Sequence, residues 1–109
     1  MNLKFDLPQR ELNILSEWVS KDEILYCVPF DIGSENVYTD GWLVITSLEA
    51  IIFENGVIER KIKIREYSDF KHINFVSNGM LESVTNKEAR PLVRYSMKYV
   101  PRYTYIAKI

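Results

Sequence analysis

An Asn-Gly pair at positions 55 and 56 restricts the possible folds of this chain more than any other feature of its sequence. The pair separates two β-prone runs, Ala50–Glu54 and Val57–Ile64. Type I′ turns need two consecutive positive φ angles, which Asn and Gly adopt at low cost, so the pattern predicts a tight β-hairpin. The second arm alternates, which predicts an outer strand with one solvated face. The residues expected on its other face are Ile58, Arg60, Ile62 and Ile64.

Further turns divide the rest of the chain into short strands. Ser77-Asn78-Gly79 predicts a second hairpin, between Phe70–Val76 and Met80–Thr85. The run Gly41–Thr46 is apolar on both faces, which predicts a strand that is buried on both sides. The remaining strands are expected at Glu23–Pro29 and Pro91–Ser96, with a polar loop over Asp31–Asp40 and a polar turn over Asn86–Arg90.

Helical spacing occurs near the two ends of the chain. Pro8 suits a first helical turn, and the residues after it predict a short amphipathic helix over Gln9–Ser20. Pro101 suits the start of a second helix over residues 101–109. The apolar positions of these two helices are Leu12, Leu15, Trp18 and Val19, and then Tyr103, Ile106 and Ala107.

This order of elements predicts a mainly β fold in a single domain, residues 1–109. We expect a small antiparallel barrel or sandwich of about seven strands, with a short N-terminal helix and a C-terminal helix that plugs an open end. Such a plan is pleckstrin-homology-like (PH-like). A chain of 109 residues has room for one core, in which we expect Leu25, Trp42, Val44 and Ile52.

The charges are balanced overall but unevenly distributed. A net charge of −1 argues against a nucleic-acid binder, which normally has a basic excess. Residues 1–55 hold three basic and ten acidic side chains, a net of −7, and residues 56–109 hold eleven and five, a net of +6. Either the halves interleave in the fold and cancel locally, or the surface is dipolar and docks on a charged neighbour.

Residue sets that carry out chemistry are missing from the sequence. His72 is the only histidine and Cys27 the only cysteine, and Cys27 lies in an apolar run where a thiol is usually inert. Neither a metal site nor a Cys-His catalytic pair is expected from them. The four glycines match no phosphate-binding loop. We therefore expect no catalytic residue, cofactor or metal, and no binding or hydrolysis of ATP. The alternative is an unrecognised small enzyme.

Two basic clusters are the candidate docking residues. The alternative is that these basic residues form a solvated face or pair with acidic side chains. Barrels of the PH type often bind phosphoinositides through basic residues around the first strand-to-strand loop, but Asp31–Asp40 holds only acidic charges. We therefore expect no specific phosphoinositide binding. The clusters are Arg60, Lys61, Lys63 and Arg65, and Arg90, Arg94, Lys98 and Arg102.

The location expected for the chain is the cytoplasm. A single cysteine suits a reducing compartment. The first residues, Met1 to Phe5, lack the apolar core of a secretory signal, and no apolar stretch approaches the ~20 residues that span a bilayer. The last residues, Tyr105–Ile109, are apolar and carry no helix stop signal, so we expect this chain to be a fragment of a longer one.

Several segments together resemble the N-terminal cytosolic extension of some bacterial ABC exporters, in which the extension precedes a six-helix membrane domain and an ATPase domain. The resemblance covers nearly the whole chain, but the matching segments are structural and none is a catalytic signature. The segments are Phe5–Pro8, Ile24–Asp31, Asp40–Thr46, Phe53–Gly56, Asn78–Glu82 and Arg94–Lys108.

The resemblance implies a non-catalytic accessory domain at the cytoplasmic side of the cell membrane, within a parent protein that uses ATP to drive transport. Its implied partner is the remainder of its own transporter chain or a cytosolic protein. In such a parent protein, the basic second half of this chain would lie just before the first membrane helix. That position fits the excess of Lys and Arg on the cytoplasmic side of membrane proteins. The alternative is a free-standing PH-like module that binds a lipid or a peptide.

Overall fold

In the computed structural model, the residues that are described are 3–4, 6–17, 19–64, 69–85 and 88–108. Within them, seven antiparallel strands form one sheet with the order β4-β3-β2-β1-β7-β6-β5, so the predicted mainly β fold class is confirmed. The elements are α1 (Gln9–Leu15), η1 (Lys21–Glu23), β1 (Ile24–Ile32), β2 (Tyr38–Thr46), β3 (Glu49–Glu54), β4 (Val57–Lys63), β5 (Asp69–Asn74), β6 (Asn78–Val84), β7 (Ala89–Ser96), η3 (Met97–Tyr99) and α2 (Val100–Lys108).

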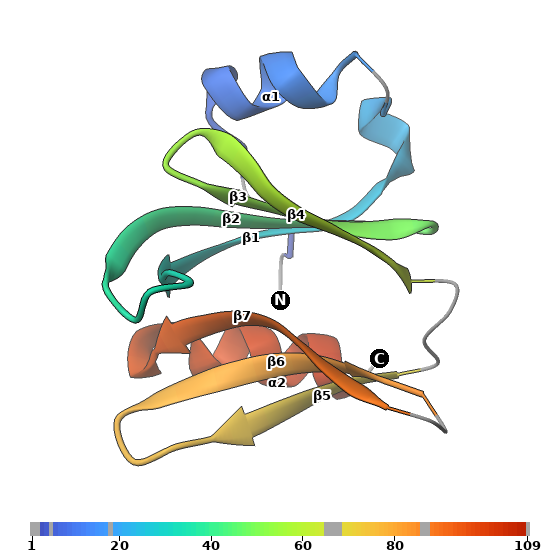
Figure 1. The fold of residues 1–109 in the computed structure, drawn as a ribbon. Helices are drawn as coiled ribbons and strands as arrows, with labels where there is room; N and C mark the ends of the chain where they lie inside the picture. The colour runs from blue at the N-terminus through green and yellow to red at the C-terminus, as the bar shows by residue number, and fades with distance from the viewer. Residues whose placement is uncertain (1–2, 5, 18, 65–68, 86–87, 109) are drawn as a thin grey trace.

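The sheet folds over into two layers because β1 and β7 pair only at Ile32 and Arg94. Strands β1 to β4 form one layer and β5 to β7 the other, with α2 beside the second layer (Figure 1). The outer face of the β1–β4 layer is covered by α1, whose Arg10 reaches Asp40 of β2 with 2.7 Å between Nη2 and Oδ2. Each layer therefore buries one face against the other, and the first layer buries its second face under a helix.

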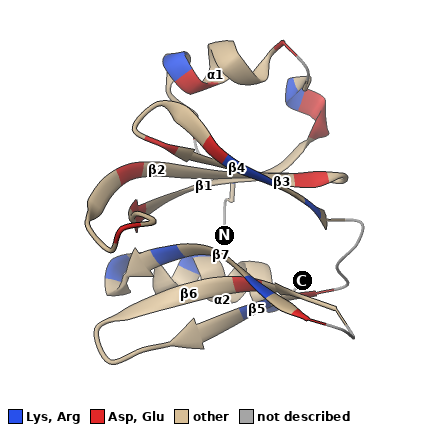
Figure 2. Cartoon of the chain, viewed as in Figure 1, with Lys and Arg blue, Asp and Glu red and all other residues tan. Residues whose placement is uncertain are grey.

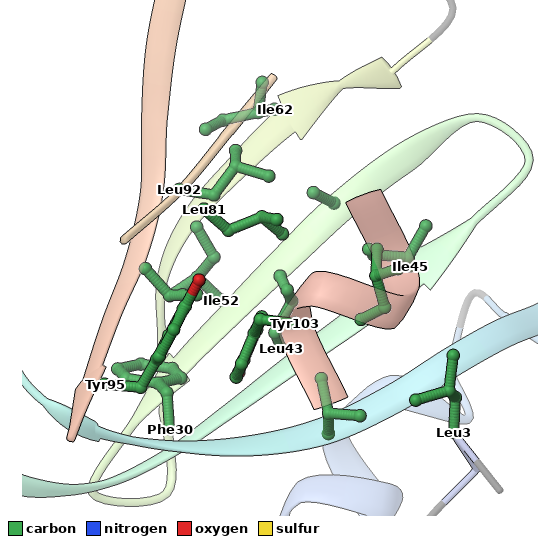
Figure 3. Close-up of a cluster of buried hydrophobic side chains, with 14 residues drawn as sticks. Leu3, Phe30, Leu43, Ile45, Ile52, Ile62, Leu81, Leu92, Tyr95 and Tyr103 are labelled. Atoms are coloured by element: carbon green, nitrogen blue, oxygen red, sulfur yellow. The ribbon is translucent and has the colours of Figure 1, made fainter. Parts of the chain in front are cut away.

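Side chains from both layers and from α2 fill the space between the layers (Figure 3). Tyr95 of β7 stacks on Tyr103 of α2, with ring centroids 3.7 Å apart, and Tyr103 donates a hydrogen bond of 2.8 Å to the carbonyl of Pro29 in β1. Helix α2 is thus fixed to both layers. The labelled members of this inner core are Leu3, Phe30, Leu43, Ile45, Ile52, Ile62, Leu81, Leu92, Tyr95 and Tyr103.

A second apolar cluster lies on the opposite face of the β1–β4 layer. Leu15 of α1 packs there with Val44 of β2 and Phe53 of β3, all of them buried. Strand β2 consequently sends Leu43 and Ile45 into the inner core and Val44 into the outer cluster. The prediction that Gly41–Thr46 is a strand buried on both sides is confirmed.

The strand pairs among the described residues contain four register shifts, which change the side-chain faces predicted from strict alternation. Strand β4 gains one residue against β3 at Glu59, because Ile52 pairs with Arg60 and Phe53 with Ile58. Ile58 therefore packs against the outer cluster while Ile62 lies in the inner core. The prediction that these residues share one face was wrong at Ile58, because a bulge shifts all later side chains by one position.

Two further bulges are at Leu25 in β1 and at Leu92 in β7, and the pairing of β1 with β2 shifts once more between Phe30 and Ile32. Val44 and Ile52 are buried as predicted, and Trp42 is half-buried against the outer cluster. Leu25 is 47% exposed, so its assignment to the core was wrong. It is the extra residue of its bulge, since Ile24 and Tyr26 pair with the adjacent Thr46 and Ile45.

One of the two predicted hairpin turns lies where the sequence predicted it, and the other does not. Asn55 and Gly56 have φ angles of 53° and 87°, as a type I′ turn requires. In the second hairpin, the N–H of Phe75 donates a 2.8 Å hydrogen bond to the carbonyl of Asn78, so the turn precedes the predicted one at 77–79. Gly79 lies inside β6, where a Cβ atom would come within 2.7 Å of Tyr95 and His72.

Several boundaries also differ from the predicted ones. Helix α1 ends at Leu15 and not at Ser20. Helix α2 begins at Val100, one residue before the predicted start at Pro101, and runs to Lys108. The loop predicted over Asp31–Asp40 shrinks to residues 33–37, because β1 and β2 extend into it. Trp18, Ile109 and two residues of the turn predicted at 86–90 lie outside the described residues.

Candidate functional site

The two predicted basic clusters do not stay together in space, but one residue from each reaches a common place. Arg60 of β4 and Arg94 of β7 line the same cavity between the two layers, with a volume of about 340 Å³. Arg65 lies outside the described residues. Lys61 and Lys63 are exposed on β4, and Arg90 is exposed on β7. Lys98 and Arg102 flank the ring of Tyr99 instead.

Arg60 points inward because it lies two residues before the core residue Ile62 on the same strand. Its guanidinium donates hydrogen bonds to the carbonyls of Pro91, at 3.1 Å, and Leu92 in β7, and its Nε lies 2.9 Å from Glu59. Leu92 is the bulged residue of β7. Arg60 therefore links the two layers at a point where the backbone ladders do not.

Arg94 lies at the single position where β1 and β7 pair. Its Nη1 donates to the Asn36 side-chain oxygen at 2.6 Å, and its Nη2 donates to that of Asn78 at 2.9 Å. The guanidinium also lies 5.3 Å from the ring centre of Phe75, within cation–π range. Arg94 thereby connects the β1–β2 loop with the β5–β6 turn, which are far apart in sequence.

The cavity between the layers has an apolar floor and a polar rim. Phe30 and Ile52 form part of the floor with Leu92, and the rim carries Glu54 and Glu59 beside the two arginines. A second hollow, of about 540 Å³, is lined by the β1–β2 loop, Tyr38, Asn78 and Arg94. Arg94 lines both spaces, together with Ile32 and Asn36.

Large apolar side chains are exposed around Arg94. Tyr38 is 83% exposed, Val76 is fully exposed, and Val37 and Phe75 are also exposed. Val37 and Tyr38 lie on the β1–β2 side and Phe75 and Val76 in the β5–β6 turn. We call these four residues with Arg94 the Arg94 surface. Clusters of exposed apolar side chains of this kind mark interaction sites more often than scattered ones do.

The structure separates the two residues that could have formed a catalytic pair. Cys27 is buried in the outer cluster, and burial, with nearby Asp6 and Glu11, raises the pKa of its thiol to about 12. His72 lies in the other layer, on β5, where its Nδ1 is 2.6 Å from the hydroxyl of Tyr95. Burial also raises the pKa of Tyr95, which favours the neutral phenol. Among the residues described, no cluster of His, Cys, Asp or Glu has a metal-binding arrangement.

The charges are separated by layer (Figure 2). Among the described residues, positions 3–64 hold six basic and eleven acidic side chains, a net of −5, and positions 69–108 hold six and three, a net of +3. The first set forms α1 and the β1–β4 layer, and the second forms β5 to β7 and α2. This arrangement favours the dipolar surface over local cancellation.

Comparison of the chain with models of protein families, with curated proteins and with solved structures finds no match. In the part of the chain that the structure describes, no helix has the length and apolarity needed to cross a membrane.

Sequence reasoning identified the two arginines of the site but not its apolar residues. Val37, Tyr38, Phe75 and Val76 read as members of a loop and of strands. The available signal was their position next to turn residues such as Asn36 and Asn78, where a large apolar side chain has little chance of burial. Which turns lie together could be learned only from the folded sheet.

Proposed function

We propose that this chain is a non-catalytic docking domain that holds a segment of a partner protein on the Arg94 surface. The observation that carries the proposal is the meeting of exposed apolar side chains from two loops around an arginine, between two hollows. Tyr and Arg are enriched among the residues that contribute most to protein–protein binding. Binding would remove Tyr38 and Val76 from water.

The arginine contacts favour a protein segment over a small anion. Both Nη atoms of Arg94 already donate to side-chain amides, so an anionic group would have to displace Asn36 or Asn78. The guanidinium is instead an anchor that holds the two loops at a fixed spacing. A partner would then bury the apolar side chains of the Arg94 surface and place one of its own side chains in the 340 Å³ cavity.

The sequence resemblance gives the proposal a context. We propose that the domain is the N-terminal cytosolic extension of an ABC exporter and that its partner is the remainder of that transporter chain or a cytosolic protein. Support comes from the matching segments, which include most of β1, β2 and α2. The alternative, a free-standing PH-like module, uses the same surface for a separate ligand.

Photo-crosslinking tests the surface and distinguishes the two contexts. The photo-reactive amino acid p-benzoylphenylalanine replaces Val37 in the natural gene product in its host cells, and Val57 serves as the control. These valines are 60% and 62% exposed, but Val57 lies beside the β3–β4 turn. We expect a defined product from position 37 only. A product within one longer chain supports the exporter, a product with a separate protein supports the module, and equal products from both positions would exclude the Arg94 surface.

A further inference from the structure

A second surface lies on η3 and α2, away from the two hollows, neither of which is lined by a residue of α2. Helix α2 turns Tyr103 and Ile106 into the core. Its opposite side, together with η3, carries both cationic and apolar side chains, which are exposed except for the half-buried Arg102. We call this the η3–α2 face, and it consists of Met97, Lys98, Pro101, Arg102, Tyr105 and Lys108.

The charge of this face is of one sign. Positions 89 to 109 contain five basic residues and no Asp or Glu, and Lys98, Arg102 and Lys108 lie on η3 and α2. Asp31 of β1 accepts a hydrogen bond from the backbone N–H of Ser96, the residue before η3, with 2.7 Å between Oδ1 and N. That carboxylate is directed to the backbone of β7. Asp69 of β5 lines a hollow beside Ile106 and Ala107 of α2, while the η3–α2 face itself carries three cationic side chains and no acidic one.

The cations are combined with exposed amphipathic side chains. The Lys98 Nζ and the Arg102 Cζ lie 5.1 and 5.3 Å from the ring centre of Tyr99. Met97 and Tyr105 are exposed beside them. Cations next to Tyr and apolar residues on one helix side are typical of segments that lie on an anionic lipid surface, where the rings reach the headgroup level.

We infer that the η3–α2 face binds the surface of an anionic phospholipid bilayer, without selecting a particular headgroup. Long cationic side chains on a convex helix suit a flat, fluid, negatively charged partner. The opposite layer, with its net charge of −5, would face away from that surface. The inference goes beyond the proposed docking function and does not depend on it, because the two surfaces share no residue.

Co-sedimentation with vesicles tests this inference. The 109-residue chain is mixed with vesicles of phosphatidylcholine alone or of equal parts phosphatidylcholine and phosphatidylserine. We expect sedimentation with the second kind only, and release at high salt, because exposed charges at 1 M salt are screened within about 3 Å. Sedimentation that survives high salt would overturn the electrostatic account.

Two variants of equal net charge locate the binding face. The test variant carries Lys98→Gln, Arg102→Gln and Lys108→Gln. The control carries Lys21→Gln in η1 and Lys61→Gln and Lys63→Gln in β4. The test variant should lose on the order of a hundredfold in partition coefficient, since each basic residue near an anionic surface contributes roughly fivefold. Circular dichroism checks that both fold.

The outcomes separate the inference from its rivals. A much smaller loss in the control than in the test variant supports the η3–α2 face. An equal loss in both variants would mean that net charge alone controls binding, and would overturn it. If the natural sequence does not sediment with phosphatidylserine vesicles, the inference is also overturned. The partner that this face fits would then be an acidic protein. Failure of the Val37 crosslink would leave this result unaffected.

Discussion

Arg60 lies between two β-bulges, one at Glu59 in its own strand and one at Leu92 in β7. The bulge in β4 determines that Arg60 faces the space between the layers, and its guanidinium reaches the carbonyls of Pro91 and Leu92. A charged residue that sequence analysis assigned to a docking cluster is therefore engaged in holding the fold together. Its hydrogen bonds replace a backbone ladder that the two layers lack at this point.

Replacing Arg60 should cost stability rather than binding. Arg60→Ala removes charged donors from two carbonyls at the cavity, and we expect a loss of about 2 kcal/mol in the free energy of unfolding. Lys63→Ala, on the same strand but exposed, should change it by less than about 0.5 kcal/mol. Urea denaturation of the two variants measures the difference. If Arg60→Ala is as stable as Lys63→Ala, the hydrogen bonds of Arg60 between the layers do not contribute to the free energy of unfolding.

At the scale of the elements, α2 is held in place by contacts remote in sequence. Tyr103 stacks on Tyr95 in β7 and donates to Pro29 in β1, so one side chain joins the helix to both layers. Complete burial raises the pKa of Tyr103 and keeps its hydroxyl protonated as a donor. The exposed Tyr105, two residues later, belongs to the η3–α2 face.

Two Tyr→Phe substitutions on α2 should have different effects. Tyr103→Phe leaves the carbonyl of Pro29 without this buried donor, and we expect a loss of about 1–2 kcal/mol in the free energy of unfolding. Tyr105→Phe removes a hydroxyl from a side chain that is 43% exposed and should leave stability within about 0.5 kcal/mol. Thermal unfolding compares the two, and equal stabilities would contradict the role given to Tyr103.

The elements also show where sequence analysis succeeds and where it fails. Asn55-Gly56 fixed a turn locally, through the φ angles that these two residues tolerate. Alternation failed at Leu25 and Glu59 because a bulge inserts one residue without any marker in composition. The Arg94 surface could not be predicted because it needs the β1–β2 loop and the β5–β6 turn to meet, which the pairing of Ile32 with Arg94 brings about.

In the whole molecule, two layers of opposite net charge share one apolar core, and each layer contributes to the Arg94 surface. The β1–β4 layer supplies Val37 and Tyr38, and the β5–β7 layer supplies Phe75, Val76 and Arg94 itself. A shift of one layer against the other would separate these residues. The proposed docking on this surface would therefore depend on the fold as a unit, and it would in turn hold the layers together.

Hydrogen–deuterium exchange tests the docking function most directly. Amide exchange is compared between the 109-residue chain and the natural gene product purified from its host with its partners. We expect slower exchange in the natural product at residues 33–38 and 75–78, because docking covers these loops and suppresses their local opening. The β3–β4 turn at 55–57 should exchange equally in both samples. Equal exchange at 33–38 and 75–78 in the two samples would contradict docking on the Arg94 surface.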